Sequence, residues 1–465
     1  MSVTGKELKE WGVPSGPVFK ELLSVFEKLK NTHSELHRKQ AQRLVRSMIK
    51  DPKPFLVDSD WAQAAKMLMP QEDKVIRLND RGCFIRIFGH NMIEGGAINQ
   101  IHMAAKLPVS VQAALMPDGH QGYGLPIGGV LATDNVVIPY AVGVDIGCRM
   151  HLSVTDIPAG EMEGMRGKLR NVLLDNTFFN AGSENDGKND DPLLDDERFN
   201  IPALMGLRVK AQKQLGTSGG GNHFVEYGVV KLKDVPGEWL AVLSHSGSRG
   251  FGYGVATHYT KLAMEKCVLQ RDAKHLAWLS LDDEDGKEYW DAMELCGDYA
   301  RACHKIIHRR ILGDLKAHLS YEYENHHNFA WKGKARVGCT DQYRDVIIHR
   351  KGATPADKGV TGIIPGSMST FTYIVEGRGH EDALCSSSHG AGRLMSRTQA
   401  KESLTMSDMK KDLISKGIEL IGGSLDECSA AYKDIEKVMA EQRELVEVKG
   451  TFMPWMVRMG GDADE

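Results

Sequence analysis

Apolar residues recur at every third or fourth position in two stretches near the start of the chain, 18–30 (VFKELLSVFEKLK) and 37–50 (HRKQAQRLVRSMIK). This spacing places the apolar side chains on one face of a helix and the polar side chains on the other. The pattern changes only at about residue 83. We therefore predict that residues 1–78 form a helical extension ahead of the rest of the chain.

From residue 83 onwards, short apolar and β-branched runs are separated by glycine-containing turns, and longer periodic stretches lie between them. The short runs are typical of buried strands and the periodic stretches of helices. Their order is mixed, without a fixed repeat or a regular strand–helix alternation. We therefore predict an α+β fold with one large mixed domain over residues 79–460 and an acidic tail at 461–465. Strands are expected in 83–89, 128–148 and 335–376, and helices in 94–107, 287–319 and 400–442.

The composition is that of a folded protein without a transmembrane helix. Of the 465 residues, 42% are hydrophobic and 26% are charged. No apolar run approaches the ~18 residues that a membrane span needs. Eight cysteines without regular spacing suit a reducing cytoplasm, where each is a core residue or a metal ligand. Since the N-terminus also lacks a signal-peptide pattern, we expect a cytoplasmic protein with no membrane partner.

The charge balance excludes a globally basic coat for nucleic acid, because 58 Lys and Arg stand against 62 Asp and Glu. One segment departs from this balance. Residues 28–53 hold eight Lys and Arg against only Glu35 and Asp51, which makes the predicted extension locally basic. Two interpretations stay open: a solvated helix face, or a surface that contacts a phosphate backbone.

Five side chains in polar or glycine-rich turns are candidate metal ligands. A lone histidine is more often structural, but several of them in turns together with an acid and a thiol favour a metal. Oxygen, sulfur and imidazole ligands suit a borderline transition ion such as Mn, Zn or Co. A thiolate can bridge two ions, so the set would form a two-metal site with open coordination positions. The five are Asp145, Cys148, His223, His245 and His327.

Glycine-rich turns supply a second kind of site. The segments GTSGGG, GIIPGSM and SSSHGAGR expose backbone N–H groups that can cradle phosphates. The last segment holds His389 inside the turn, with Arg393 four residues further on. A histidine facing a bound phosphate is a candidate nucleophile. There is no Walker A sequence, and the glycine string at 250–254 lacks the strand–turn–helix context of a Rossmann fold.

Eight segments in order along residues 83–448 resemble the RtcB family of RNA ligases. They are MPDGHQGYGLPIGG, VGVDIGCRM, GGGNHFVEYG, HSGSRG, HHNFAW, HRKGATPADKGVTGIIPGSM, SSSHGAGRLMSR and AYKDIEKVMAEQRELVEV. The resemblance implies a GTP- and Mn(II)-dependent ligase that joins an RNA 3′-phosphate or 2′,3′-cyclic phosphate to a 5′-hydroxyl through a histidine–GMP intermediate. It implies RNA repair or tRNA splicing as the setting, RNA as the partner, and possible use of an archease-type activator.

The resemblance also implies roles for particular residues within central β-sheets that surround a two-metal and nucleotide pocket. One Mn ion would be held by Asp145, Cys148 and His223, and the other by Cys148, His245 and His327. His389 matches the guanylylated histidine, Asp118 an active-site acid, and Arg249 a contact to RNA or triphosphate. The implied nucleotide pocket comprises Asn222, His223, Phe224, Val225, Glu226, His327, Asn328, Pro365, Gly366, Ser367, Met368, Thr372, His389, Gly390, Ala391 and Gly392.

The C-terminus departs from the family pattern. Relatives carry a nucleotide-contacting Lys about eleven residues after the Leu-Val-Glu-Val run, and here that count reaches Met459. Lys449 is then an ordinary charged residue, and the neighbouring Arg458 is the candidate to replace the missing donor. Two other functions stay open for the whole chain. They are a two-metal RNA phosphatase or cyclic phosphodiesterase, and an inactive protein that binds RNA ends.

Overall fold

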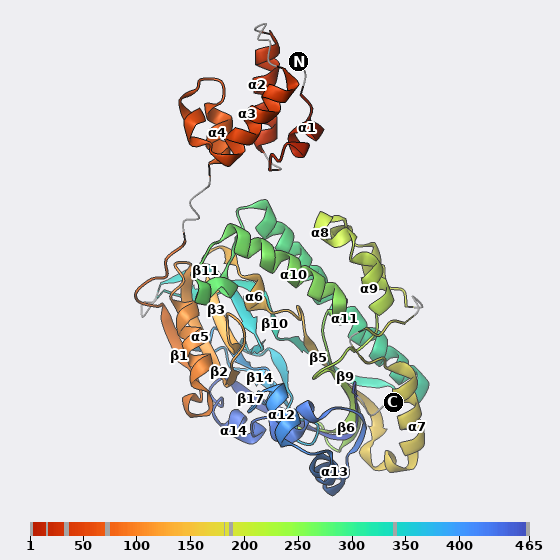
Figure 1. Cartoon of the computed structure of the whole chain (residues 1–465). Coiled ribbons are helices and arrows are strands. Elements are labelled where there is room, and N and C mark those ends of the chain that lie inside the picture. The colour runs from red at the N-terminus through yellow and green to blue at the C-terminus, as the bar shows by residue number, and fades with distance from the viewer. Residues whose placement is uncertain are drawn as a thin grey trace. The chain divides into compact units, whose positions relative to one another are not determined.

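The computed structural model describes residues 3–14, 17–31, 37–69, 75–180, 182–185, 189–337 and 342–461, so residues 462–465 of the expected acidic tail lie outside the described residues. The chain divides into two compact units, Met1–Val75 and Ile76–Glu465 (Figure 1). No helix in the described ranges is both long enough and apolar enough to cross a membrane.

The first unit is helical and has a core of its own. The apolar faces of its helices meet around Leu22, Val45 and Met48, and the rings of Trp11 and Trp61 both contact Phe26 edge-on. Thr4 caps the first helix, since it accepts a hydrogen bond from the Glu7 N–H while the Glu7 carboxylate accepts one from Thr4. The elements are α1 (Gly5–Glu10), α2 (Pro17–Asn31), α3 (Arg38–Lys50), the 3-10 helix η1 (Lys53–Val57) and α4 (Ala62–Leu68).

The second unit contains two large sheets, which confirms the predicted mixed α+β fold. The five-stranded sheet has the order β1-β2-β3-β11-β10 and is antiparallel except for the β1–β2 pair. Helix α5 (Gly95–Ala105) connects β1 to β2 and packs against both. The strands are β1 (Phe84–Ile87), β2 (Ser110–His120), β3 (Ile127–Thr133), β10 (Asn328–Arg336) and β11 (Tyr343–Lys351).

The larger sheet runs in the order β13-β14-β17-β6-β7-β5-β9, and β16 pairs in parallel with β17. Its edge strands β13 and β9 contact each other, so the sheet nearly closes on itself. Helix α11 (Glu284–Leu315) packs on β5 and β7 and lies beside α7 (Arg166–Asn176) and α10 (Arg249–Lys266) (Figure 1). The strands are β5 (Arg149–Pro158), β6 (Phe224–Leu232), β7 (Trp239–Ser246), β9 (Leu319–His326), β13 (Thr361–Ile364), β14 (Thr372–Gly377), β16 (Glu419–Gly422) and β17 (Val446–Met459).

Short elements complete the second unit. Two small antiparallel pairs are β4 (Val136–Val137) with β8 (Leu279–Ser280) and β12 (Ala353–Pro355) with β15 (Ser386–Ser388). The short helices are α6 (Pro139–Val142), α8 (Pro202–Met205), α9 (Arg208–Gln214), α12 (Arg397–Ser403), α13 (Met406–Ser415) and α14 (Ile435–Ala440). The helical prediction for 400–442 was wrong at 419–422. There the chain forms β16, because pairing with the long strand β17 outweighs local helical spacing.

Strand order brings the predicted metal ligands to one end of the larger sheet. Strands β6, β7, β5 and β9 are neighbours, and in the β6–β7 and β5–β7 pairs His245 lies opposite Phe224 and Met150. His223 precedes β6 and Cys148 precedes β5. His327 lies between the last residue of β9 and the first of β10, where the chain passes from one sheet to the other.

Candidate metal and nucleotide site

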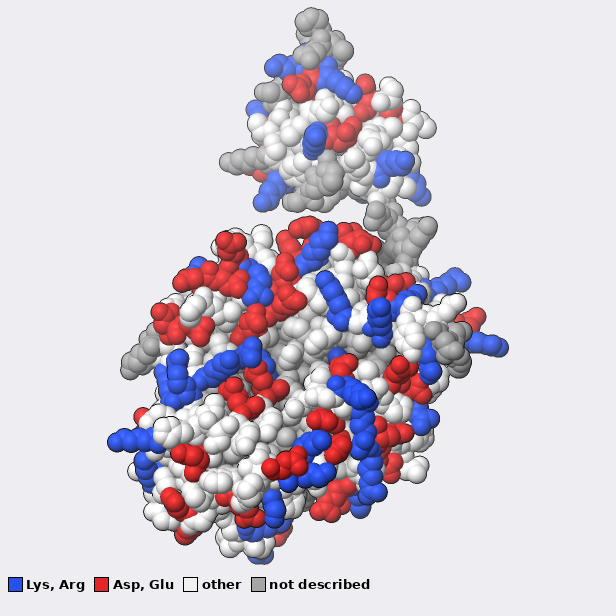
Figure 2. Space-filling model, turned by 180° about the vertical axis from the view of Figure 1, so that it is seen from behind, with Lys and Arg blue, Asp and Glu red and all other residues white. Residues whose placement is uncertain are grey.

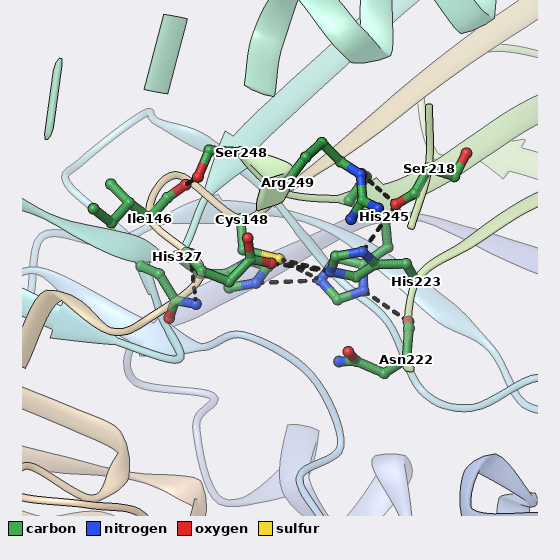
Figure 3. Close-up of polar contacts among 12 residues, drawn as sticks. Ile146, Cys148, Ser218, Asn222, His223, His245, Ser248, Arg249 and His327 are labelled. Atoms are coloured by element: carbon green, nitrogen blue, oxygen red, sulfur yellow. Dashed lines mark hydrogen bonds and ion pairs between the residues drawn. The ribbon is translucent and has the colours of Figure 1, made fainter. Parts of the chain in front are cut away.

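Cys148 lies at the centre of two overlapping groups of possible metal ligands. One group joins it to His245 and His327, and the other to Asp145 and His223. In each group the ligand atoms lie within 4.8 Å of one another. The Cys148 Sγ is 3.2 Å from His245 Nε2 and 3.7 Å from His223 Nε2, and the His245 and His327 Nε2 atoms are 3.3 Å apart. Figure 3 shows these side chains pointing toward one another.

Backbone carbonyls fix the orientation of two of the imidazoles. His223 Nδ1 is 2.9 Å from the Ser218 carbonyl oxygen, and His245 Nδ1 is 3.0 Å from that of Asn222. An N–H at Nδ1 donates to each oxygen, which leaves the lone pair of a neutral ring on Nε2. Histidine ligands in metal sites are oriented in this way. The Nε2 atoms of both rings are therefore presented to the centre of the cluster.

The donor set fits a divalent transition ion. The Asp145 carboxylate lies 3.0 Å from His223 Nε2, so an oxygen and a nitrogen ligand atom lie side by side, where one cation could contact both. Burial and the nearby His223 lower the pKa of His245 to about 3, so that ring is neutral at pH 7. His327 Nδ1 is buried and has no hydrogen-bond partner among the described atoms. Carboxylate, thiolate and imidazole together match the chemistry predicted from the sequence.

The Cys148 thiol is protonated until a cation arrives. Burial first, and then the Asp145 carboxylate, raise the pKa of this thiol well above its usual value. The carboxylate has the opposite shift: burial raises the pKa of Asp145, but His223, Cys148 and Arg249 together outweigh burial and lower the pKa below its usual value. A bound cation would stabilise the thiolate, so binding releases a proton and affinity rises with pH.

A close backbone approach lets Asp145 reach this position. A Cβ at Gly247 would lie 2.0 Å from the Asp145 Oδ1, so only glycine fits beside this carboxylate. The turn that carries Asp145 and Cys148 is held from the other side by Asn328. The Asn328 backbone carbonyl accepts from Gly147 N–H at 2.8 Å, and its side-chain amide donates to the Asp145 carbonyl at 3.2 Å.

His389 lies beside this cluster and is held by Asp118. Its ring centroid is 5.0 Å from that of His327. Its Nδ1 is 2.6 Å from Asp118 Oδ2, which also accepts the His389 backbone N–H at 3.1 Å. Burial raises the pKa of Asp118, but His389, Lys433 and His120 outweigh it and hold the pKa below its usual value. The carboxylate thus holds the Nδ1 proton and leaves Nε2 available for attack.

A cavity of about 410 Å³ joins the two groups of residues. Its walls include the glycine-rich turns at 365–368 and 389–392, and its far side includes the inward face of β6 and β17. Burial raises the pKa of Glu226 on β6 well above its usual value, so a neutral carboxyl group faces the cavity. The predicted residues that line the cavity are Asp145, Cys148, Asn222, Phe224, Glu226, His245, His327, Asn328, Pro365, Gly366, Ser367, Met368, Thr372, His389, Gly390, Ala391 and Gly392.

Four predicted site residues lie outside the cavity wall, and one of them is the buried Asp118 described above. His223 belongs to the ligand group but not to the cavity wall. Val225 is fully buried in the core on the other face of β6, because side chains alternate along a strand. Arg249 is buried at the start of α10, where its guanidinium donates to Thr217 Oγ1 at 3.3 Å and to the Asn180 carbonyl at 3.5 Å. Arg249 is nevertheless near enough to the ligand group for its charge to contribute to the lowered pKa of Asp145.

The alternation of side chains along a strand also decides whether Arg458 can replace the nucleotide-contacting Lys of relatives. On β17 the cavity is lined by Val457 and Met459, whereas Arg458 points to the opposite face. Its Nη1 donates to the carbonyls of Leu173 and Leu174, at 3.0 and 2.6 Å. The idea that Arg458 replaces a nucleotide-contacting Lys is therefore wrong in this structure. Lys449 forms ion pairs with Glu376 and Glu447, 3.5 and 3.3 Å away, and lies outside the cavity wall.

Several cavity residues were not assigned from the sequence, although most belong to segments that carry the family resemblance. Lys351 follows His349 and Arg350 in HRKGAT, and burial lowers its pKa to about 7. Its Nζ donates to the Tyr123 carbonyl at 2.6 Å and lies 4.9 Å from the centre of the Tyr140 ring. The position of most of these residues inside the motifs shared with the family was the sequence signal that could have identified them. The other unassigned wall residues include Tyr123, Tyr140, Arg393, Arg397, Glu427 and Tyr432.

Comparison with known proteins identifies the family. The sequence model described as "tRNA-splicing ligase RtcB" matches residues 100–198 and 203–460. The chain is 32% identical over 387 residues to the RNA-splicing ligase RtcB of Escherichia coli K12. This match covers 77% of this chain and 92% of that protein. The chain is 28% identical over 449 residues to the tRNA-splicing ligase RtcB of Thermococcus kodakarensis, covering 80% and 92%. The chain therefore belongs to the RtcB family of RNA ligases.

Proposed function

We propose that this chain is a GTP- and Mn(II)-dependent RNA ligase that joins a 3′-phosphate or 2′,3′-cyclic phosphate end to a 5′-hydroxyl end. The observation that carries the proposal is that His389, held by the buried Asp118, lines the same cavity as Cys148, His245 and His327. A two-metal phosphatase or cyclic phosphodiesterase needs the cluster but no histidine nucleophile. A protein that only binds RNA ends needs neither.

His389 is the proposed nucleophile. With its Nδ1–H donated to Asp118, its Nε2 attacks the α-phosphorus of GTP, a phosphorus–nitrogen bond forms, and the bond to the bridging oxygen breaks to release pyrophosphate. Asp118 stabilises the positive charge that the ring gains. This role for Asp118 is supported by its complete burial and its direct contact with the ring.

The guanylyl group then moves to RNA. An oxygen of the RNA 3′-phosphate attacks the same phosphorus, the phosphorus–nitrogen bond breaks, and His389 is restored. The 5′-hydroxyl next attacks the activated 3′-phosphorus and GMP leaves as the 3′–5′ bond forms. A cyclic phosphate end first consumes one water to become a 3′-phosphate.

Two Mn(II) ions would be held by the two groups around Cys148, one through Asp145 and His223 and the other through His245 and His327. When bound, they would supply Lewis-acid neutralisation of phosphate charge. The glycine turns at 365–368 and 389–392 would bind phosphate or ribose through backbone N–H groups. Asn222, Glu226 and Asn328 offer polar groups along the same wall.

We further propose RNA repair or tRNA splicing in the cytoplasm as the setting, with an archease-type activator as a possible partner. The names of the relatives, RNA-splicing ligase and tRNA-splicing ligase, support the splicing role.

The test is covalent labelling with GTP that carries ³²P at the α position, in the presence of Mn(II). We expect an acid-labile label on the unaltered chain and none on His389→Ala. His258→Ala, an exposed histidine on α10, is the matched control and should label normally. Label that persists on another residue of His389→Ala would contradict the assignment. Release of phosphate from RNA without any label would favour the phosphatase.

A further inference from the structure

Four basic side chains form one line along α3 of the first unit. Lys39, Arg43, Arg46 and Lys50 are separated by four, three and four residues, which keeps them on one face of an α-helix. All four are exposed. At 1.5 Å per residue the line is about 17 Å long, a length over which a nucleic-acid strand presents several phosphates. We call these four residues the α3 basic line.

The opposite face of α3 anchors the helix in the core of its unit. Ala41, Val45 and Met48 are fully buried there, packed in the same cluster as Leu22 and Trp61. The helix is therefore held by its apolar face. The basic line contributes nothing to that packing and is available to a ligand.

The basic line has no acidic partner within the part of the chain that the structure describes. Helix α3 contains no Asp or Glu, and no described carboxylate lies within ion-pair distance of the four side chains. Arg38, at the start of the same helix, does have a partner in Glu7. Like charges three and four residues apart destabilise a helix. The arrangement is thus one that a bound polyanion would stabilise.

The charge of the whole chain is distributed unequally between the units. Residues 1–75 hold 13 Lys and Arg against 10 Asp and Glu, whereas residues 76–465 hold 45 against 52. Figure 2 shows acidic and basic side chains mixed on the visible face of the second unit. The family match begins only at residue 100, so the first unit lies outside it. A net acidic ligase unit gains little from general attraction to RNA.

We propose that the α3 basic line binds the phosphodiester backbone of RNA and so adds a substrate contact that lies outside the ligase unit. The proposal rests on the proposed function in one respect, the identity of the polyanion as RNA. Arg and Lys side chains at this spacing contact phosphates without reading bases, so the contact is independent of sequence.

The test measures the salt dependence of RNA binding by the full chain. The probe is a 30-nucleotide single-stranded RNA with a 3′-hydroxyl end, which the ligation chemistry cannot use. The variant carries Lys39→Gln, Arg43→Gln, Arg46→Gln and Lys50→Gln, since Gln retains helix propensity. Four lost phosphate contacts should reduce the slope of log K against log[salt] by up to about 2.8. Between 50 and 200 mM salt, the factor by which affinity falls should then be about 50-fold smaller in the variant than in the unaltered chain.

A second variant removes the same charge from the other helices of the unit. It carries Lys9→Gln, Lys20→Gln, Lys30→Gln and Lys66→Gln, which are exposed in α1, α2 and α4. We expect its slope to stay near that of the unaltered chain. An unchanged slope in the α3 variant, or an equal decrease in both variants, would overturn the proposal. GMP labelling needs no RNA, so a chain that is not labelled would contradict the ligase proposal. The proposal for the α3 basic line would still be decided by the salt slopes.

Discussion

At the scale of single residues, Cys148 is the side chain on which the candidate centre depends. Its Sγ belongs to both ligand groups, whereas His327 belongs to one. The surrounding site supplies two oriented imidazoles and one carboxylate. Removal of the thiol would therefore affect both proposed ions, and removal of the His327 imidazole would affect one.

We predict that Cys148→Ser weakens binding of both Mn(II) ions by about 100-fold or more, because a serine hydroxyl is not ionised near pH 7. His327→Ala should weaken mainly one ion. Calorimetric titration of metal-free protein with Mn(II) measures both. Cys83→Ser, away from the cluster, is the control. Two tight ions retained in Cys148→Ser would exclude a bridging thiolate.

Residue types in turns were sufficient to predict which acid, thiol and imidazole side chains cluster, but not the direction of each side chain. Asp145, Cys148 and the histidines could be selected because acid, thiol and imidazole occur in turns where no packing role explains them. The same reasoning could not exclude Val225 and Arg458 from the residues that face the cavity. Each lies beside true cavity residues in sequence, and only the pairing of β6 with β17 fixes which alternate side chains face the cavity.

At the scale of elements, the long helix α11 contributes two buried histidines that support the strand carrying His245 of the candidate metal site. His304 Nδ1 and His308 Nε2 lie 2.6 and 2.7 Å from the Ser244 hydroxyl on β7, next to His245. His308 Nδ1 also lies 2.8 Å from the Ser153 hydroxyl on β5. The sequence around them, HKIIHRR, looks basic, but the helix turns these two rings inward, where burial keeps them neutral.

We predict that stability falls as the pH drops below about 6.5. Burial lowers the pKa of His304 and His308 well below 6.5, so below that pH the unfolded chain binds protons that the folded chain does not. The contribution of these histidines to the free energy of unfolding is fully present above their pKa in the unfolded chain. Below that pKa it is lost, by up to about 1.4 kcal/mol per pH unit for each histidine. Urea unfolding of metal-free protein at pH 7.5, 6.5 and 5.5 measures this.

The double variant His304→Gln, His308→Gln serves as the comparison. It should be less stable at pH 7.5 but lose less stability on acidification. An identical pH dependence in both proteins would assign the effect to other groups, and a rise in stability at low pH would contradict the prediction.

The elements themselves were predictable where the pattern is strong and local. The periodicity of 287–319 predicted α11, and that of 94–107 predicted α5. The strand β16 was missed since four residues carry too little pattern, and its existence depends on β17, more than twenty residues away in sequence. The arrangement of strands into two sheets could not be predicted from pattern alone, because it is set by pairings distant along the chain.

At the scale of the whole molecule, each unit has its own core and should unfold as its own cooperative body. We predict that Mn(II) stabilises only the second unit, because all of its candidate ligands lie there. At an ion concentration of 100 times Kd, each site adds about 2.7 kcal/mol. Calorimetry of the full chain with Mn(II) or with a chelator should move one transition and leave the other in place. Equal movement of both transitions would contradict separate units.

The position of His327 gives the metal centre a mechanical role. The residue before it ends a strand of one sheet and the residue after it begins a strand of the other, while the other two proposed ligands of its ion are His245 in the larger sheet and Cys148 directly before that sheet's strand β5. Coordination of an ion by His327 would therefore hold the two sheets together at the point where the chain passes from one to the other. Loss of the ions should then quicken amide hydrogen exchange on both sides of the junction together, in β10 as much as in β9. Metal supply would in that case set the rigidity of the catalytic body as well as its chemistry.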